Sequence, residues 1–168
     1  LEAAVKLDRK TILTFGGAYS NHIYATAAAC RELGWKSIGI IRGEETLPLN
    51  PTLSFAKECG MKLHYVSRAA YRKKNEESFP QNLKDQFGDF YLIPEGGTNE
   101  LAVKGVKEFA QSLSQEAEFD YLCLPVGTGG TMAGMIEGVD KSKQVLGFVS
   151  LKGGEFLEDE IRTYTEKT

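Results

Sequence analysis

Hydrophobic residues in this chain form short continuous runs separated by longer stretches with helical spacing. The runs that predict strands are, in order, residues 11–15, 37–41, 62–66, 90–93, 121–126 and 145–151. These runs lack the polar alternation of a strand that faces solvent on one side. They are typical of parallel strands buried on both faces.

Helical patterns fill the intervals between the predicted strands. They cover residues 20–33, 50–60, 79–87, 99–113, 132–138 and 156–164. Asn50-Pro51 joins an N-cap to a first-turn proline, and Gly34 closes the helix before it. Six βα units in succession predict an α/β fold of parallel strands with helices on both faces.

A glycine-rich turn, Gly127-Thr128-Gly129-Gly130-Thr131, links a predicted strand to a helix at the carboxyl edge of the sheet, where ligands bind in such folds. Glycines leave backbone N–H groups free, and the helix N-terminus adds a positive dipole end. The turn lacks the Gly-Lys-Ser/Thr of a Walker A loop, and Met132 replaces the third glycine of a dinucleotide fingerprint. It therefore predicts a cradle for one phosphate, with a ligand-free tight turn as the alternative.

A second unusual turn, Phe15-Gly16-Gly17-Ala18-Tyr19-Ser20-Asn21-His22, also joins a strand to a helix. Ser20 is a good N-cap, and Asn21 and His22 could be ordinary polar residues of a first turn. Two adjacent glycines, however, allow close approach of the backbone to a ligand. A hydroxyl, an amide and an imidazole crowded at one helix end favour a binding site.

Composition restricts the class of protein. The 168 residues are 42% hydrophobic and 26% charged, with a formal net charge of −3, as in soluble globular proteins. There is no basic patch for nucleic acid, since the cluster Arg72-Lys73-Lys74 with Arg68 is typical of a solvated helix face. No apolar run approaches the ~20 residues that cross a bilayer, and residues 1–6 lack the order of a signal peptide.

The three cysteines, Cys30, Cys59 and Cys123, are widely spaced and form no CxxC pair. This pattern argues against a disulfide framework and against a zinc site, so no metal is expected. We expect all three to be buried free thiols, which fits a reducing cytoplasm.

Taken together, the loops resemble those of one enzyme family. The two glycine segments above and Ile93-Pro94-Glu95-Gly96-Gly97-Thr98-Asn99 occur in the order and spacing of pyridoxal-phosphate enzymes with the tryptophan synthase β-like fold (fold type II). The chain is most similar to the 1-aminocyclopropane-1-carboxylate deaminase and D-cysteine desulfhydrase group, over nearly its whole length. The resemblance implies pyridoxal 5'-phosphate as cofactor and a lyase or deaminase acting on a small amino acid, with release of ammonia and a keto acid.

The resemblance also implies a role for each loop residue. The residues that would hold the cofactor phosphate are Gly127, Thr128, Gly129, Gly130 and Thr131. Asn21 would hydrogen-bond the phenolic oxygen of the pyridine ring. Ser20 would be catalytic, either beside the substrate carboxylate or in proton transfer, with His22 and Tyr19 in the surroundings. Tyr19, Ile23 and Tyr24 stand where the family more often has Gln, Thr and Arg, which bears on substrate choice.

The family's Schiff-base lysine lies in an Asn-Lys pair upstream of the first glycine loop, which here would precede Leu1. Lys6 and Lys10 do not follow Asn, and both lie in a charged, helix-like lead-in where a solvated lysine is expected. We therefore expect an internal fragment with an incomplete fold that is inactive by itself. Residues 1–94 would form the small α/β domain, and residues 95–168 part of the large α/β cofactor domain.

Two other functions remain open. A catalytically silent module could bind a phosphorylated ligand or a partner, and an Asn-Lys pair upstream of Leu1 in longer sequence would argue against it. A nucleotide-binding flavodoxin-like domain also fits six βα units, but its dinucleotide and Walker patterns are missing. Exposed strand edges in an incomplete domain and the resemblance both predict a homodimer.

Overall fold

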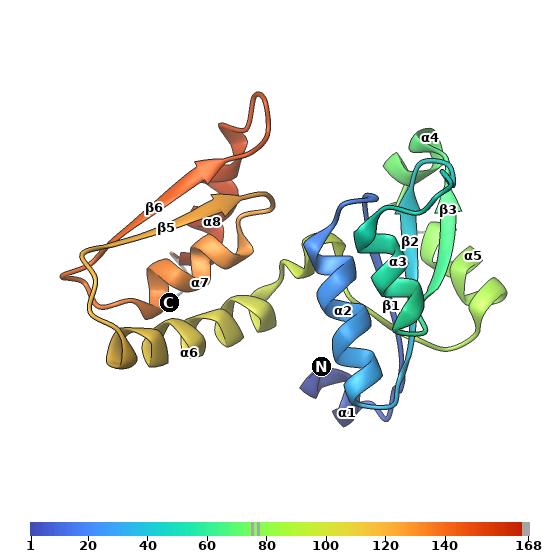
Figure 1. The fold of residues 1–168 in the computed structure, drawn as a ribbon, viewed down its shortest axis with the longest axis horizontal. Coiled ribbons are helices and arrows are strands. Elements are labelled where there is room, and N and C mark those ends of the chain that lie inside the picture. The colour runs from blue at the N-terminus through green and yellow to red at the C-terminus, as the bar shows by residue number, and fades with distance from the viewer. Residues whose placement is uncertain (75, 77, 166–168) are drawn as a thin grey trace. The chain divides into compact units, whose positions relative to one another are not determined.

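The computed structural model of the chain describes residues 1–74, 76 and 78–165 (Figure 1). The chain forms two compact units, which we call unit 1, residues 1–95, and unit 2, residues 96–168. The first unit ends at Glu95, one residue after the domain boundary at Pro94 that the sequence predicts. Gly96 and Gly97, just after it, have φ values of 69° and 72°, which glycine adopts without strain.

Unit 1 is built on a four-stranded parallel sheet with the strand order β3-β2-β1-β4. Its strands are β1 (Thr11–Gly16), β2 (Lys36–Arg42), β3 (Lys62–Val66) and β4 (Tyr91–Leu92). In the register of the sheet, Leu13 of β1 lies between Ile38 of β2 and Leu92 of β4. The four strands match the predicted runs, apart from a residue or two at their ends.

Helices cover both faces of this sheet (Figure 1). The helices of unit 1 are α1 (Glu2–Lys6), α2 (Asn21–Glu32), α3 (Pro51–Glu58), α4 (Arg68–Arg72) and α5 (Ser78–Phe87). On one face, Ile23 of α2 and Leu53 of α3 pack with Ile41. On the other, Tyr71 of α4 and Leu83 of α5 pack with Phe15. Ile12 of β1 packs in a further cluster with Ala4 and Cys30, so both β1 and β2 contribute to more than one apolar core, as expected for doubly buried strands.

Helix α4 is too short for its spacing to be recognised in the sequence. Its basic residues Arg68 and Arg72 are exposed, and so is Lys73, as expected for a solvated helix face. Lys74 differs, because its side chain is only 22% exposed and its ammonium lies 3.2 Å from the Glu95 carboxylate.

Unit 2 contains a parallel pair of strands, β5 (Tyr121–Val126) and β6 (Gln144–Val149). A 3-10 turn, η1 (Glu95–Gly97), leads into it from unit 1. Its helices are α6 (Glu100–Glu116), α7 (Gly130–Gly138) and α8 (Phe156–Thr165). Ala110 of α6 and Met135 of α7 pack with Leu122 and Val145 of the strands. This confirms the α/β class in both units.

The opposite face of the β5–β6 pair is apolar and exposed. Cys123 pairs with Leu146 and Pro125 with Phe148, so these side chains share one face with Tyr121. Tyr121 is 58% exposed and Phe148 62%. The prediction of a buried thiol is confirmed for Cys30 and Cys59 but is wrong for Cys123, which is exposed. Cys123 lies on the face that no described helix covers.

None of the helices in the described ranges has the length and apolar character of a membrane span.

Candidate functional site

The glycine loop of unit 1, residues 15–22, brings the N-terminus of α2 against the end of β1. Ser20 is the N-cap of α2, and its Oγ accepts a hydrogen bond from the Ile23 N–H at 3.3 Å. A Cβ on Gly16 would lie 2.5 Å from Ile23 Cγ1 and 2.8 Å from Ser20 Oγ. Gly16 is therefore required by the packing of α2 itself. A Cβ on Gly17 would meet only the Arg42 guanidinium, at 3.5 Å.

Two predicted site residues of this loop reach the surface of unit 1. Asn21, the first residue of α2, is exposed, and Tyr19 is 78% exposed. Two departures from the family pattern have a structural role instead. Ile23 is fully buried, and the ring of Tyr24 stacks on Phe55 at 3.8 Å between centroids.

His22 is tied into the interior of unit 1. Its Nε2 lies 2.7 Å from the Thr14 hydroxyl oxygen, and this hydroxyl donates to the Ile93 carbonyl at 2.9 Å. Burial lowers the pKa of His22 below its usual value, while the nearby Glu95 carboxylate acts in the opposite direction. Thr14 was missed in the sequence, although a polar residue inside an apolar run was a usable signal.

A group of charged residues surrounds the Tyr71 ring near His22. The Lys74 ammonium lies 5.1 Å and the Arg42 guanidinium carbon 5.6 Å from the ring centroid. The Tyr71 hydroxyl is buried and has no partner within hydrogen-bond geometry among the described residues. Burial first, and then the nearby Glu95 carboxylate, raise the pKa of Tyr71 far above its usual value. The Glu95 carboxylate thus acts to raise the pKa values of both Tyr71 and His22, and it pairs with the Lys74 ammonium.

The glycine loop of unit 2, residues 127–131, begins α7 without a side-chain cap. The N-cap is Gly129, in the left-handed conformation with φ 79°, and it makes no side-chain cap hydrogen bond. By contrast, Ser20, Asn50 and Asn99 cap α2, α3 and α6 through their side chains. The first-turn N–H groups of α7 have no partner within the helix and none from a cap. They are therefore available to an anion.

The loop that follows η1 packs against this glycine loop within unit 2. The hydroxyl oxygens of Thr98 and Thr128 lie 2.6 Å apart. A Cβ on Gly96 would lie 2.5 Å from Thr128 Oγ1, and one on Gly130 would lie 2.8 Å from Thr98 Oγ1. The structure thus brings residues 96–98 and 127–130 together. Thr98 belongs to a recognised motif, yet its contact with Thr128 was not foreseen.

The two predicted halves of the site lie in different units. Ser20, Asn21 and His22 belong to unit 1, whereas Gly127 to Thr131 belong to unit 2. Closure of both loops around one ligand stays a prediction.

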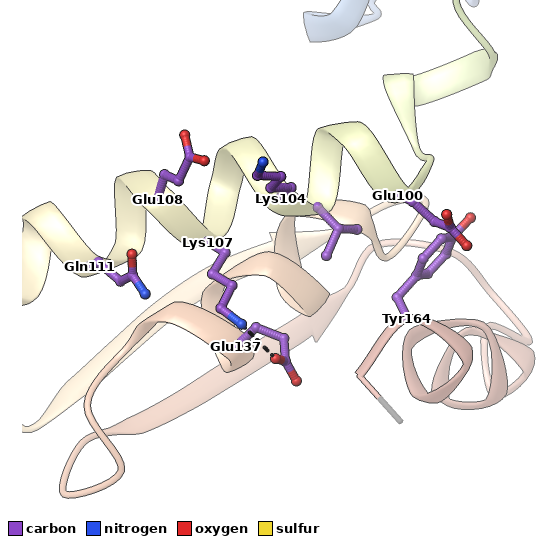
Figure 2. Close-up of a pocket in the computed structure, with 8 residues that line it drawn as sticks. Glu100, Lys104, Lys107, Glu108, Gln111, Glu137 and Tyr164 are labelled. Atoms are coloured by element: carbon purple, nitrogen blue, oxygen red, sulfur yellow. Dashed lines mark hydrogen bonds and ion pairs between the residues drawn. The ribbon is translucent and has the colours of Figure 1, made fainter. Parts of the chain in front are cut away.

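A cavity of about 740 Å³ lies elsewhere in unit 2 (Figure 2). It is lined by Glu100, Val103, Lys104, Lys107, Glu108, Gln111, Glu137 and Tyr164, none of which is a predicted site residue. Figure 2 shows Lys107 extending from α6 toward Glu137 of α7, with 3.3 Å between ammonium and carboxylate. Because carboxylates outnumber ammonium groups in this lining, the cavity does not favour a phosphate.

The two lysines of the lead-in, Lys6 and Lys10, are both exposed, as expected. Across residues 1–74, 76 and 78–165, no group of three or more His, Cys, Asp or Glu side chains could hold a metal ion.

Comparison with known proteins gives the following matches. A model of the family described as pyridoxal-phosphate dependent enzymes matches residues 1–153. A putative 1-aminocyclopropane-1-carboxylate deaminase from Pyrococcus abyssi is 29% identical over 94% of this chain and 50% of its own length. One from Thermotoga maritima is 34% identical over 81% of this chain and 45% of its own. The chain thus spans about half the length of these curated relatives.

Two further matches extend the comparison. The mitochondrial bifunctional D-cysteine desulfhydrase/1-aminocyclopropane-1-carboxylate deaminase of Arabidopsis thaliana is 30% identical over 79% of this chain and 37% of its own length. Among solved structures, an ACC deaminase homologue superposes with a TM-score of 0.77 at 22% identity, covering 98% of this chain and 52% of its own. At that identity the structural match shows the fold alone.

Proposed function

The chain belongs to the pyridoxal-phosphate dependent enzymes, and from this premise we propose that it is part of a deaminase or lyase acting on a small amino acid, either 1-aminocyclopropane-1-carboxylate or D-cysteine. The names of the relatives support this substrate class. The whole protein's activity is part of the proposal, because the chain spans about half of those relatives.

The two candidate reactions balance with water alone. 1-Aminocyclopropane-1-carboxylate and water give 2-oxobutanoate and ammonia when the ring opens. D-Cysteine and water give pyruvate, hydrogen sulfide and ammonia. Both reactions withdraw electrons from the carbon that carries the amino group, and bound pyridoxal phosphate supplies the electron sink for this.

The observation that supports cofactor binding best is the uncapped N-terminus of α7. Gly129 provides no cap side chain, and a Cβ there would lie 2.9 Å from Ile161 Cγ1. Ile161 thus packs close to Gly129, and no cap side chain occupies the first-turn N–H groups, where the helix dipole favours an anion. The residues present fit a phosphate, which Gly127, Thr128, Gly129, Gly130 and Thr131 would hold.

In the proposed site, α2 would provide the groups for the reactive part of the cofactor and for the substrate. The exposed Asn21 amide would donate to the phenolic oxygen of the cofactor ring. The Ser20 Oγ accepts from Ile23, which leaves its own proton available to a substrate carboxylate. Ser20 would orient the substrate or move a proton at that oxygen.

The cofactor proposal is tested by titrating pyridoxal 5'-phosphate into the ¹⁵N-labelled chain. We expect the amide resonances of Gly129, Gly130 and Thr131 to shift together, while those of a capped helix start, Thr52 and Leu53 in α3, stay in place. Inorganic phosphate should produce a weaker version of the same pattern. Shifts spread over the surface, or none at residues 127–131, would count against the proposal.

A silent binding module is the second candidate function. The uncapped start of α7 supports it equally, since binding a phosphate there requires no lysine. Phosphate binding without turnover in the longest natural form of the protein would support the module.

A further inference from the structure

Thr14 is a completely buried polar residue inside an apolar strand. Its exposed fraction is 0%, and its neighbours Leu13 and Phe15 enter the apolar core beneath α4 and α5. A buried hydroxyl is destabilising unless it is hydrogen-bonded. Thr14 meets this requirement with two groups, from α2 and from the segment after β4.

The two hydrogen bonds of Thr14 determine where the protons lie. The Ile93 carbonyl can only accept, so the single hydroxyl proton of Thr14 points to it. Toward His22 the same oxygen can then only accept. The proton of the 2.7 Å contact therefore sits on His22 Nε2. In the neutral imidazole, this leaves Nδ1 without a proton.

His22 Nδ1 is left as an acceptor on a half-buried side chain of unit 1. Within the described residues, no hydrogen bond to this nitrogen is found. The buried side-chain polar atoms without a partner there are the hydroxyls of Tyr65 and Tyr71, so Nδ1 is not an orphaned interior atom. It lies on the first turn of α2, next to Asn21 and two residues after Ser20.

We propose that Thr14 is a positioning residue of the candidate site, which fixes His22 as the Nε2–H tautomer and so presents Nδ1 as an unprotonated hydrogen-bond acceptor. The ligand group that this nitrogen would take is a nitrogen donor, such as the amino group of an amino acid or of an aminated cofactor. The choice of ligand rests on the proposed function, whereas the tautomer rests on the hydrogen bonds alone.

Protonation of His22 would remove the acceptor, because the added proton could go only to Nδ1. The charged group that faces His22 is the Glu95 carboxylate, which favours protonation. Lys74 pairs with Glu95 at 3.2 Å and offsets part of its charge. Burial opposes the charged ring more strongly than Glu95 favours it, so Nδ1 remains an acceptor at neutral pH.

The tautomer is tested directly by long-range ¹H–¹⁵N NMR of the labelled 168-residue chain. We expect the His22 proton on Nε2, protected from exchange with water, and Nδ1 unprotonated. Thr14→Val should abolish that protection, and Thr14→Ser should restore it. Thr26→Val, at a buried threonine of α2, is the control variant and should leave the protection of the His22 proton unchanged. The His64 resonances should stay the same in all of these variants. A proton on Nδ1 in the wild-type chain overturns the proposal, as does protection that survives Thr14→Val.

The acceptor role is tested with two ligands that need no lysine. Pyridoxamine 5'-phosphate carries an aminomethyl group on its ring, and 4-deoxypyridoxine 5'-phosphate carries a methyl group at the same ring position. We expect the chain to prefer the amine by about tenfold, the size of one hydrogen bond to a charged donor. His22→Gln should keep the preference, because its amide can donate to Thr14 and accept from the ligand, and His22→Leu should lose it. Equal affinity of the wild-type chain for both overturns the acceptor role, whereas binding of neither contradicts the proposed function and leaves the tautomer result standing.

Discussion

The hydroxyl oxygens of Thr98 and Thr128 lie 2.6 Å apart and join two loops that are 30 residues apart in the chain. Thr98 follows the Gly96-Gly97 pair at the unit boundary, and Thr128 belongs to the loop proposed to hold phosphate. The position of the phosphate loop therefore depends on the segment that leads into unit 2. Substitutions in either loop are expected to affect both.

Replacement of Gly129 should destabilise unit 2. An alanine at φ 79° is strained by about 1–2 kcal/mol, and its Cβ would lie 2.9 Å from Ile161 Cγ1. Gly127→Ala is the matched control, because its Cβ would meet no atom within 4 Å. Denaturant unfolding should show a loss of about 1–3 kcal/mol for Gly129→Ala and little change for the control. Equal losses would show that the conformation of Gly129 does not matter.

In unit 1, the adjacent glycines should differ in their response to the same substitution. Gly16→Ala would force apart β1 and the first turn of α2, since the new Cβ would lie 2.5 Å from Ile23 Cγ1. Overpacking of this kind typically costs about 1–3 kcal/mol. Gly17→Ala should be tolerated, because only the Arg42 guanidinium is nearby, at 3.5 Å. Thermal unfolding of both variants, together with exchange of the Ile23 amide, compares them, and a more harmful Gly17→Ala would contradict the packing described here.

His22 should make the stability of the chain depend on pH. Its folded pKa lies below the unfolded value of 6.5, so the unfolded chain takes up the proton first as pH falls. The free energy of unfolding therefore decreases from pH 6.5 down to the folded pKa, and this contribution is fully present above pH 6.5. The difference in the free energy of unfolding between wild type and His22→Gln, measured with urea across that pH range, separates the contribution of His22 from that of the carboxylates. A difference that does not vary with pH would rule it out.

The 168-residue chain alone should show no turnover of 1-aminocyclopropane-1-carboxylate or D-cysteine. Lys6 and Lys10 are exposed in the lead-in to β1, outside the two glycine loops that would hold the cofactor, and turnover needs an amine oriented at the cofactor. A keto-acid assay with added pyridoxal phosphate checks this, with Lys6→Ala and Lys10→Ala as comparisons. Keto-acid release together with a visible absorption band from lysine-bound cofactor would refute the prediction.

The exposed apolar face of β5–β6 should support the proposed homodimer. Phe148, at 62% exposure, pairs with Pro125 on this face, and a lysine there would place a charge in an apolar contact. Phe148→Lys is expected to shift sedimentation toward the monomer. Tyr19→Lys, at an exposed aromatic residue of unit 1, should leave the association unchanged. A wild-type chain that sediments as a monomer would contradict the homodimer itself.

The sequence predicts most of the fold because each unit repeats one simple pattern. Continuous apolar runs predicted all six strands, although the run at 90–93 yields only Tyr91–Leu92, an edge strand that pairs with β1 alone. Helix α7 begins at Gly130, two residues before the predicted start, because left-handed Gly129 sets its N-cap. The exposure of Cys123 could not be predicted, since an apolar run does not show which face will be covered.

The candidate site is less visible in the sequence, because its supporting contacts are distant along the chain. The glycines and the polar residues of each loop were evident as motifs. Thr14, however, finds its partners 8 and 79 residues away, and Thr98 meets Thr128 across 30 residues. Such pairs depend on how βα units stack. Periodicity alone does not determine this.

The buried Thr14 hydroxyl also limits how β1 can align with its neighbours in the sheet. A shift of the strand by one residue would turn every side chain to the opposite face, and a shift by two would place Ile12 or Gly16 beneath His22. Either misalignment would leave the His22 imidazole and the Ile93 carbonyl without the Thr14 hydroxyl as a hydrogen-bond partner. The single oxygen atom of the Thr14 hydroxyl thus favours the native pairing over competing ones during folding, at a strand whose other buried side chains, Ile12, Leu13 and Phe15, are hydrocarbon.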